Sequence, residues 1–162
     1  MVKIQHKIAV LSGKGGVGKS MVAANLAVVL SQEGFATGIV DVDLSGPSIP
    51  QILGVRDQRL MSESEGIIPA VCPLGIKVIS MGFMLEDKEA VTWFHDLRRG
   101  AIEEFLAHVN YGALDFLIID LPPGTGTETI AVMQYIPNTM YQVFSNRKMS
   151  LKLLLERWGM GG

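Results

Sequence analysis

The chain is built around Ser12-Gly13-Lys14-Gly15-Gly16-Val17-Gly18-Lys19-Ser20, a glycine-rich segment between two apolar runs. The run Ile8–Leu11 before it reads as a strand, and the run Met21–Leu30 after it reads as a buried helix. Glycines without a Cβ let the backbone turn tightly and direct its N–H groups at phosphate oxygens, while the helix N-terminus adds partial positive charge. Lys19 would reach the β- and γ-phosphates of a nucleotide, and the Ser20 hydroxyl would bind Mg²⁺. The segment therefore predicts a P-loop rather than a glycine-rich turn with incidental lysines.

Two later strands are expected to end in aspartates at the same edge of the sheet. Thr37–Asp43 reads as a strand that places Asp41 and Asp43 on one face. Leu114–Asp120 is a continuous apolar run ending in an acid, which is typical of a buried parallel strand. Ligands bind outside the carboxyl ends of such strands, so Asp120 is predicted to hold Mg²⁺ as a Walker B aspartate. The alternatives are solvated loop carboxylates and a capping aspartate. The loop after this strand is predicted to sense the γ-phosphate through Pro122, Pro123 and Gly124.

The remaining pattern predicts an α/β fold of the P-loop NTPase type. Its mostly parallel sheet would carry helices on both faces, in three α/β/α layers. Gly34 should cap the first helix, and a short helix should follow Gly46-Pro47-Ser48-Ile49-Pro50 through Leu53. A further strand over Gly75–Met81, a helix over Ala90–His108 and a small hairpin within Arg56–Pro73 are expected as well. Trp93-Phe94-His95-Asp96 is interpreted as packing and surface, because adjacent helical residues do not face each other.

Composition narrows the class of protein. The 162 residues are 48% hydrophobic with a formal charge of −2, which suits one globular domain and gives no reason to expect nucleic acid. No run of about 18 apolar residues or signal peptide is evident, so neither a membrane span nor stable membrane association is expected. Cys72 is the single cysteine, interpreted as structural rather than as a lone metal ligand. A reducing, cytoplasmic setting is the natural expectation.

The glycine-rich segment resembles the deviant Walker A loop of the MinD-type ATPases, which include ParA, the arsenite-pump ATPase and nitrogenase iron protein. Two further blocks, Asp41–Pro50 and Gly75–Phe83, together with Asp120–Gly126, resemble the Mrp/ApbC branch of iron–sulfur cluster carriers. That branch carries clusters to apoproteins in an ATP-dependent manner. The resemblance implies ATP, Mg²⁺ and an iron–sulfur cluster as cofactors, a homodimer, and apo iron–sulfur proteins and scaffold proteins as partners.

By that resemblance, Lys14 would reach across the dimer to the partner's nucleotide, and Asp43 would position the attacking water. The catalytic residues would be Lys14, Lys19 and Asp43, and the Mg²⁺ ligands would be Ser20, Asp41 and Asp120; the roles of Asp41 and Asp43 stay open between them. The nucleotide would be bound by Gly13, Lys14, Gly15, Gly16, Val17, Gly18, Lys19, Ser20 and Met21.

The chain departs from the family at three places. Met21 stands where a threonine is usual, and Phe94-His95-Asp96 replaces Arg-Gly-Pro. No Cys-x-x-Cys pair is present. The resemblance covers a P-loop ATPase domain over residues 1–138, and residues 139–162 are expected to be a divergent tail. Because members of that family continue with further strands, the resemblance implies a sheet that is incomplete at the C-terminal end. We hypothesise an out-of-frame or truncated end there, with a core strand missing and a helix over Met149–Trp158 covering part of the gap.

Two other functions compete with an ATP-hydrolysing carrier. One is a positioning ATPase of the MinD or ParA kind, which would gain support from an amphipathic basic helix at the end of the chain. The other is a nucleotide-binding module without turnover, which Met21 and the altered tail favour. Nucleotide binding without phosphate release would identify the latter.

Overall fold

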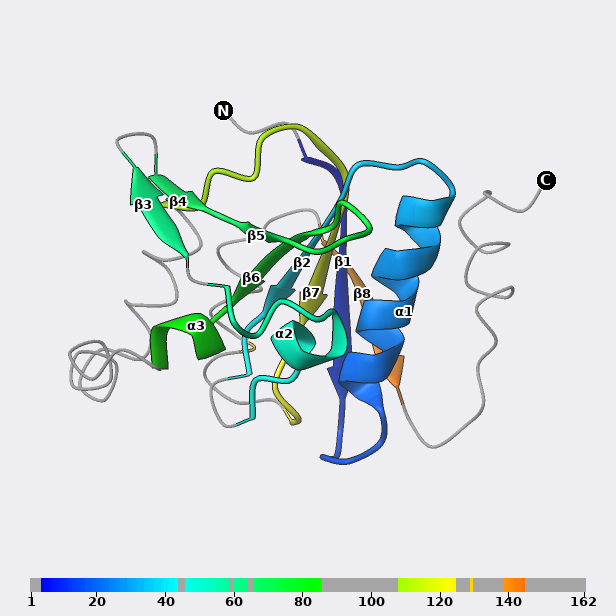
Figure 1. The fold of residues 1–162 in the computed structure, drawn as a ribbon. Coiled ribbons are helices and arrows are strands. Elements are labelled where there is room, and N and C mark those ends of the chain that lie inside the picture. The colour runs from blue at the N-terminus through cyan, green and yellow to red at the C-terminus, as the bar shows by residue number, and fades with distance from the viewer. Residues whose placement is uncertain are drawn as a thin grey trace.

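The computed structural model describes residues 4–43, 46–58, 60–63, 66–85, 108–124, 129 and 139–144. They form a six-stranded sheet with helices against it, and a separate two-stranded hairpin (Figure 1). In chain order the elements are β1 (Ile4–Ser12), α1 (Lys19–Gln32), β2 (Thr37–Asp41), α2 (Ile49–Ile52), β3 (Met61–Glu63), β4 (Gly66–Ile68), β5 (Ala70–Val71), β6 (Lys77–Ser80), α3 (Gly82–Leu85), β7 (Leu114–Asp120) and β8 (Thr139–Phe144).

The sheet is almost entirely parallel, as the sequence predicts. Its strand order is β5-β6-β2-β7-β1-β8, and only the short β5 runs antiparallel to its neighbour. The register sets Asp41 of β2 directly beside Asp120 of β7, while β7 also pairs with β1. The carboxyl ends of β1, β2 and β7 therefore meet at one edge, where the aspartates and the glycine-rich segment come together.

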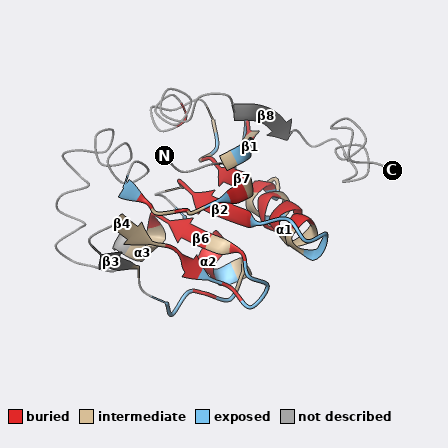
Figure 2. Ribbon diagram, turned by 90° about the horizontal axis from the view of Figure 1, so that it is seen from above, coloured by how far each residue is buried: buried red, intermediate tan, exposed pale blue. Residues whose placement is uncertain are grey.

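Apolar side chains cover both faces of the sheet. On one face α1 packs its Ala23, Ala27 and Leu30 into a buried cluster with strand residues such as Ile39 and Ile118 (Figure 2). On the other face a second buried cluster includes Val40, Ile79, Leu117, Ile119, Val109 and Tyr111. The helix expected over Ala90–His108, and Trp93–Asp96 within it, lie outside the described residues apart from His108, so the second helical layer stays a prediction.

Helix α1 ends where the sequence predicts. Gly34 has a φ of 89°, a left-handed conformation that favours glycine. Its N–H donates to the carbonyl of Ser31 at 3.0 Å, and the N–H of Phe35 donates to that of Leu30 at 3.1 Å. This pair of bonds is the Schellman motif, which satisfies the last carbonyls of the helix and turns the chain toward β2.

Several element bounds differ from the sequence-based expectation. Strand β2 ends at Asp41, two residues before the expected Asp43. The N–H of Val42 still donates to the carbonyl of Asp120 at 3.0 Å, but the next N–H, of Asp43, donates to the Asp41 side chain instead. The chain leaves the ladder at that point. The expected small hairpin is confirmed as β3 and β4, and Cys72 is confirmed as a buried core residue.

The expectation of a missing core strand after Asn138 is wrong. Thr139–Phe144 forms β8, which pairs in parallel with β1 from Lys7 to Ser12. The segment carries Thr, Tyr, Val and Phe, residue types that suit strands, and the edge of β1 offers unpaired backbone groups to it. The domain boundary at 138/139 stays a prediction, and the helix expected over Met149–Trp158 lies outside the described residues.

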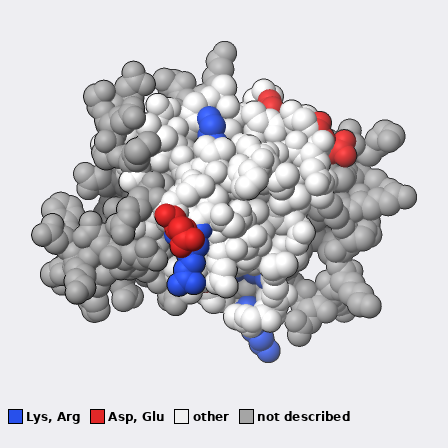
Figure 3. Space-filling model, viewed as in Figure 1, with Lys and Arg blue, Asp and Glu red and all other residues white. Residues whose placement is uncertain are grey.

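Two surface features bear on the class of protein. On the face shown in Figure 3, the charged side chains of described residues lie in small separate groups of both signs. Within the described ranges, no helix combines the length and the apolar character needed to cross a membrane.

Candidate functional site

The glycine-rich segment connects β1 directly to α1 at the carboxyl edge of the sheet. Gly16 and Gly18 have φ values of 72° and 84°, so both need the left-handed conformation that glycine adopts without strain. The N–H of Val22 donates to the carbonyl of Gly18 at 3.0 Å and closes the first turn of α1. No side chain of the described ranges caps this helix. The N–H groups of the first turn therefore remain available to an anion, as a P-loop requires.

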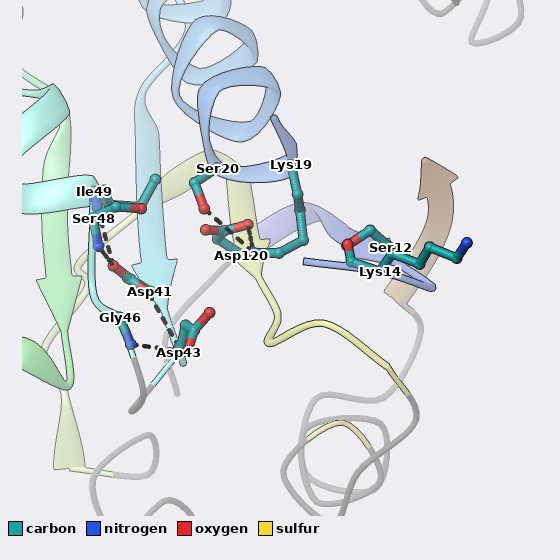
Figure 4. Close-up of polar contacts among 10 residues, drawn as sticks. All are labelled: Ser12, Lys14, Lys19, Ser20, Asp41, Asp43, Gly46, Ser48, Ile49 and Asp120. Carbon is teal, nitrogen blue, oxygen red and sulfur yellow. Dashed lines mark hydrogen bonds and ion pairs between the residues drawn. The ribbon is translucent and has the colours of Figure 1, made fainter. Parts of the chain in front are cut away.

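A buried ion pair lies at the centre of this edge. The Nζ of Lys19 donates to Oδ1 of Asp120 at 2.6 Å, and these side chains are 7% and 0% exposed. The same Nζ lies 3.3 Å from the Ser20 hydroxyl (Figure 4). Burial raises the pKa of Asp120, and the charge of Lys19 opposes that shift. The sequence-predicted residues Lys19, Ser20 and Asp120 are thus brought together.

One oxygen of Asp120 has no partner. Its Oδ2 is fully buried and accepts no hydrogen bond among the described residues. An unpaired buried carboxylate oxygen is costly, so it indicates a place for a ligand. Carboxylate and hydroxyl oxygens are the donors that Mg²⁺ prefers, and Mg²⁺ commonly takes one or two protein oxygens beside phosphates and water. Asp120 and Ser20 therefore fit Mg²⁺.

Asp41 has the opposite situation, because both of its oxygens are occupied. Oδ1 accepts the N–H of Asp43 at 3.1 Å, and Oδ2 accepts the N–H groups of Ser48 at 2.9 Å and Ile49 at 3.1 Å. Burial raises the pKa of Asp41 to about 6, while the Ile49 N–H opposes the shift and the nearby Asp120 adds to it. These bonds satisfy the start of α2. This arrangement gives no support to the prediction that Asp41 lies near Mg²⁺.

Asp43 lies two residues beyond the end of β2, at the same edge of the sheet. It is partly exposed, and its Oδ1 accepts the N–H of Gly46 at 3.2 Å. Its negative charge is close enough to raise the pKa of Asp120 further. The structure therefore places Asp43 near the Lys19–Asp120 pair.

Lys14, within the glycine-rich segment, and Met21, directly after it, are both exposed to solvent. The Lys14 side chain is exposed and points away from the Lys19–Asp120 pair (Figure 4). Its carbonyl accepts the Ser12 hydroxyl at 3.0 Å, a contact that the sequence did not predict. Met21, in the first turn of α1, is 53% exposed. Neither side chain takes part in the ion pair.

The loop after β7 runs beside the glycine-rich segment, as expected. The N–H of Gly124 donates to the carbonyl of Ser12 at 2.8 Å. A Cβ built on Gly15 would lie 3.9 Å from Cγ of Pro123. Pro122, Pro123 and Gly124 therefore lie next to the predicted phosphate position.

Comparison with known proteins agrees with this geometry. A family model described as NUBPL iron-transfer P-loop NTPase (ParA) matches residues 3–153. The iron–sulfur cluster carrier protein of Saccharolobus solfataricus is 51% identical over 138 residues, covering 85% of this chain and 47% of that protein. The cytosolic Fe-S cluster assembly factor NUBP2 homolog of Dictyostelium discoideum is 47% identical, covering 83% of this chain and 52% of that protein. The chain thus spans about half the length of these curated relatives.

A solved structure shares the fold. The nucleotide-binding protein of Archaeoglobus fulgidus, in complex with ADP, matches with a TM-score of 0.76 and 41% identity. The match covers 97% of this chain and 61% of that one. The P-loop NTPase fold predicted from the sequence is thereby confirmed.

Proposed function

The chain belongs to the ParA family of NUBPL-type iron-transfer P-loop NTPases, and on that premise we propose that it binds and hydrolyses ATP in the delivery of iron–sulfur clusters to apoproteins. The observation that carries the proposal is the buried Lys19–Asp120 pair next to the N-terminus of α1. Among the described residues, no side chain caps that N-terminus and Oδ2 of Asp120 has no hydrogen-bond partner. The iron–sulfur cluster is proposed as the cargo because the relatives are named as an iron–sulfur cluster carrier and an Fe-S cluster assembly factor.

Nucleotide binding rearranges the ion pair. The N–H groups at the start of α1 would receive the phosphates, together with the backbone of the loop from Gly13 to Gly18. Met21 would contribute its backbone N–H, since its side chain carries no hydroxyl. Lys19 would exchange Asp120 for the β- and γ-phosphates. Once the Lys19 ammonium has moved to the phosphates, the Asp120 carboxylate can bind Mg²⁺ in its place. Nucleotide and Mg²⁺ should therefore bind together.

Ser20 and Asp120 would hold Mg²⁺, which neutralises developing charge on the phosphates when bound. Asp43, at the same edge, would orient the attacking water. Lys14 would act in trans, because its side chain points outward and away from its own site (Figure 4). That role requires a homodimer, in which each subunit completes the other's site. Catalysis would then rest on positioning and charge stabilisation, as in phosphoryl transfer generally.

The cluster is cargo in this proposal, and no residue of this chain is assigned to ligate it. Cluster ligation usually takes four thiolates, whereas the chain has the single Cys72, buried within the α1-side core at 4% exposure. Apo iron–sulfur proteins and scaffold proteins are the proposed partners. A cytoplasmic location is proposed from the relatives, two of which are named as cytosolic assembly factors.

The test is phosphate release from ATP with and without Mg²⁺, together with binding of a fluorescent ATP analogue. Wild type should bind and turn over, and Lys19→Ala should lose both. Gln32→Ala, an exposed change at the far end of α1, is the matched control and should behave as wild type. Binding without any phosphate release would support a module without turnover instead. The proposal that the chain delivers iron–sulfur clusters is tested by measuring transfer of a preloaded cluster to an apo-ferredoxin in the presence of a scaffold protein.

A further inference from the structure

Two sequence blocks remain without a role in the site described above. One is Gly46-Pro47-Ser48-Ile49-Pro50, and the other is Ser80-Met81-Gly82-Phe83. The structure brings them together beside β2. We call Asp43 and residues 46–48 the β2 loop, since they follow β2 and lead into α2.

Asp41 holds the β2 loop from the strand side. Its two oxygens accept N–H groups from both ends of the loop, those of Asp43, Ser48 and Ile49. Because Asp41 is fully buried in the central strand β2, its carboxylate has a fixed position relative to Asp120 in the next strand. The three bonds therefore tie the path of the loop to the sheet. A carboxylate that accepts several N–H groups is a strong and directional anchor.

Gly82 contacts the same loop from the β6 side. A Cβ built on Gly82 would lie 2.6 Å from both Cβ and Cγ of Pro47, and 3.2 Å from the Ser80 hydroxyl. Real Cβ atoms do not approach so closely, and Pro47 is a rigid ring that cannot swing aside. The backbone of Gly82 is itself fixed, because its N–H donates to the Ser80 hydroxyl at 3.0 Å and the preceding N–H donates to the Asp41 carbonyl. Only glycine lets the loop lie this near β6.

We propose that Asp41 and Gly82 are positioning residues that fix the β2 loop from two sides and thereby place the Asp43 carboxylate relative to Asp120. The inference rests on the proposed ATP hydrolysis for its consequence, but the fixing of the loop stands on its own geometry. Asp41 then acts on the reaction through Asp43, without touching Mg²⁺ or the phosphates. Displacing the loop should impair water positioning while leaving the P-loop, and so nucleotide affinity, unchanged.

The first experiment measures amide hydrogen exchange by NMR on the full chain without nucleotide. The amides of Asp43, Ser48 and Ile49 should be protected in wild type. Both Gly82→Ala and Asp41→Asn should speed their exchange by about tenfold or more, since each weakens bonds to a charged acceptor. Asn offers one acceptor oxygen where the loop uses two. Amides within β1 and α1 should keep their protection in both variants.

The matched control is Gly38→Ala, another added methyl in the same sheet. Gly38 lies at the start of β2, away from the β2 loop. Its added Cβ would lie 2.8 Å from Cδ1 of Leu114, which is the tip of a flexible side chain. This variant reproduces general overpacking without touching the β2 loop. The amides of Ser48 and Ile49 should exchange as in wild type.

The second experiment measures phosphate release and nucleotide affinity in the same variants. Gly82→Ala and Asp41→Asn should lower kcat by about 10- to 100-fold with unchanged affinity and unchanged Mg²⁺ dependence of binding. Gly38→Ala should retain kcat. If wild type does not hydrolyse ATP, the proposed function fails, and the exchange experiment still decides whether the loop is fixed as described.

Three results would overturn the proposal. Rapid exchange of Ser48 and Ile49 in wild type would show that Asp41 does not anchor the loop. Normal exchange in folded Gly82→Ala would show that the Pro47 contact is not needed. Weakened Mg²⁺ dependence of nucleotide affinity in Asp41→Asn, but not in Gly82→Ala, would make Asp41 a metal ligand instead.

Discussion

Asp120 and Asp41 are buried neighbours in adjacent parallel strands, yet their carboxylates have different hydrogen-bond partners. Oδ1 of Asp120 pairs with the Lys19 cation, and its buried Oδ2 has no hydrogen-bond partner within the part of the chain that the structure describes. Asp41 has both oxygens filled by backbone N–H groups. Burial raises the pKa of both carboxyls. Hydrogen-bond partners, rather than burial or position at the sheet edge, therefore distinguish the two carboxylates, and this difference is why we propose Asp120 as the Mg²⁺ ligand and Asp41 as the anchor of the β2 loop.

The largest expected effect comes from breaking the Asp120 side of the comparison. Asp120→Ala leaves the buried Lys19 ammonium without its partner and should cost about 3–5 kcal/mol of the free energy of unfolding, measured by urea denaturation. Nucleotide affinity should also lose its dependence on Mg²⁺. The Lys19→Met/Asp120→Ala double variant removes both charges and should recover part of the stability. A double variant no more stable than Asp120→Ala would argue against the ion pair.

The free energy of unfolding should depend on pH differently in the wild type and in the Asp41→Asn variant. Burial raises the pKa of Asp41 from its ordinary value of 3.8 to about 6, so the folded state binds the proton more tightly than the unfolded chain. The stability that this proton contributes is present below pH 4 and is lost as pH rises through 6. The free energy of unfolding of the wild type, taken relative to that of Asp41→Asn, should therefore be up to about 3 kcal/mol higher at pH 4 than at pH 7. Thermal unfolding of both proteins in magnesium-free buffer measures the difference; parallel curves would contradict it.

A smaller loss is expected when the Asp41 side is weakened at neutral pH. Asp41→Asn leaves at least one buried backbone N–H without an acceptor and should cost about 1–3 kcal/mol at pH 7. Urea denaturation checks it, and the cost should fall below that of Asp120→Ala. Ser31→Ala, which removes a hydrogen bond between α1 and the Leu74 carbonyl on an exposed surface, is a suitable control. Equal costs for the two aspartates would erase the distinction between them.

The smallest effect concerns the exposed rim of the site. Met21→Thr should restore a hydroxyl beside the predicted α-phosphate and tighten nucleotide binding about fivefold, the equivalent of one net hydrogen bond of about 1 kcal/mol. Because Met21 is 53% exposed, the melting temperature should not move. Titration with a fluorescent ATP analogue measures the affinity. A Met21→Ser variant with no gain would indicate that the hydroxyl lies out of reach.

Local pattern predicted the central parts of the molecule well. The strand Leu114–Asp120 was predicted at its observed bounds, since a buried parallel strand needs an unbroken apolar run. The start of α1 at Lys19 and its end before Gly34 follow from glycines that local backbone geometry requires. Strand β8 is missed although Thr139–Phe144 carries residue types that suit a strand, because its membership of the sheet depends on parallel pairing with the distant strand β1.

Sequence pattern alone predicts the glycine-rich turn, the strand and helix that flank it, and the carboxylates, lysine and hydroxyl that gather at the sheet edge. These depend on backbone freedom and apolar periodicity, which are properties of short segments. Tertiary contacts are what fill both oxygens of Asp41, bring Gly82 against Pro47, and leave Oδ2 of Asp120 without a partner in the described ranges. Those facts arise where segments far apart in the chain approach within hydrogen-bond or van der Waals distance, and no local pattern records which group fills which position.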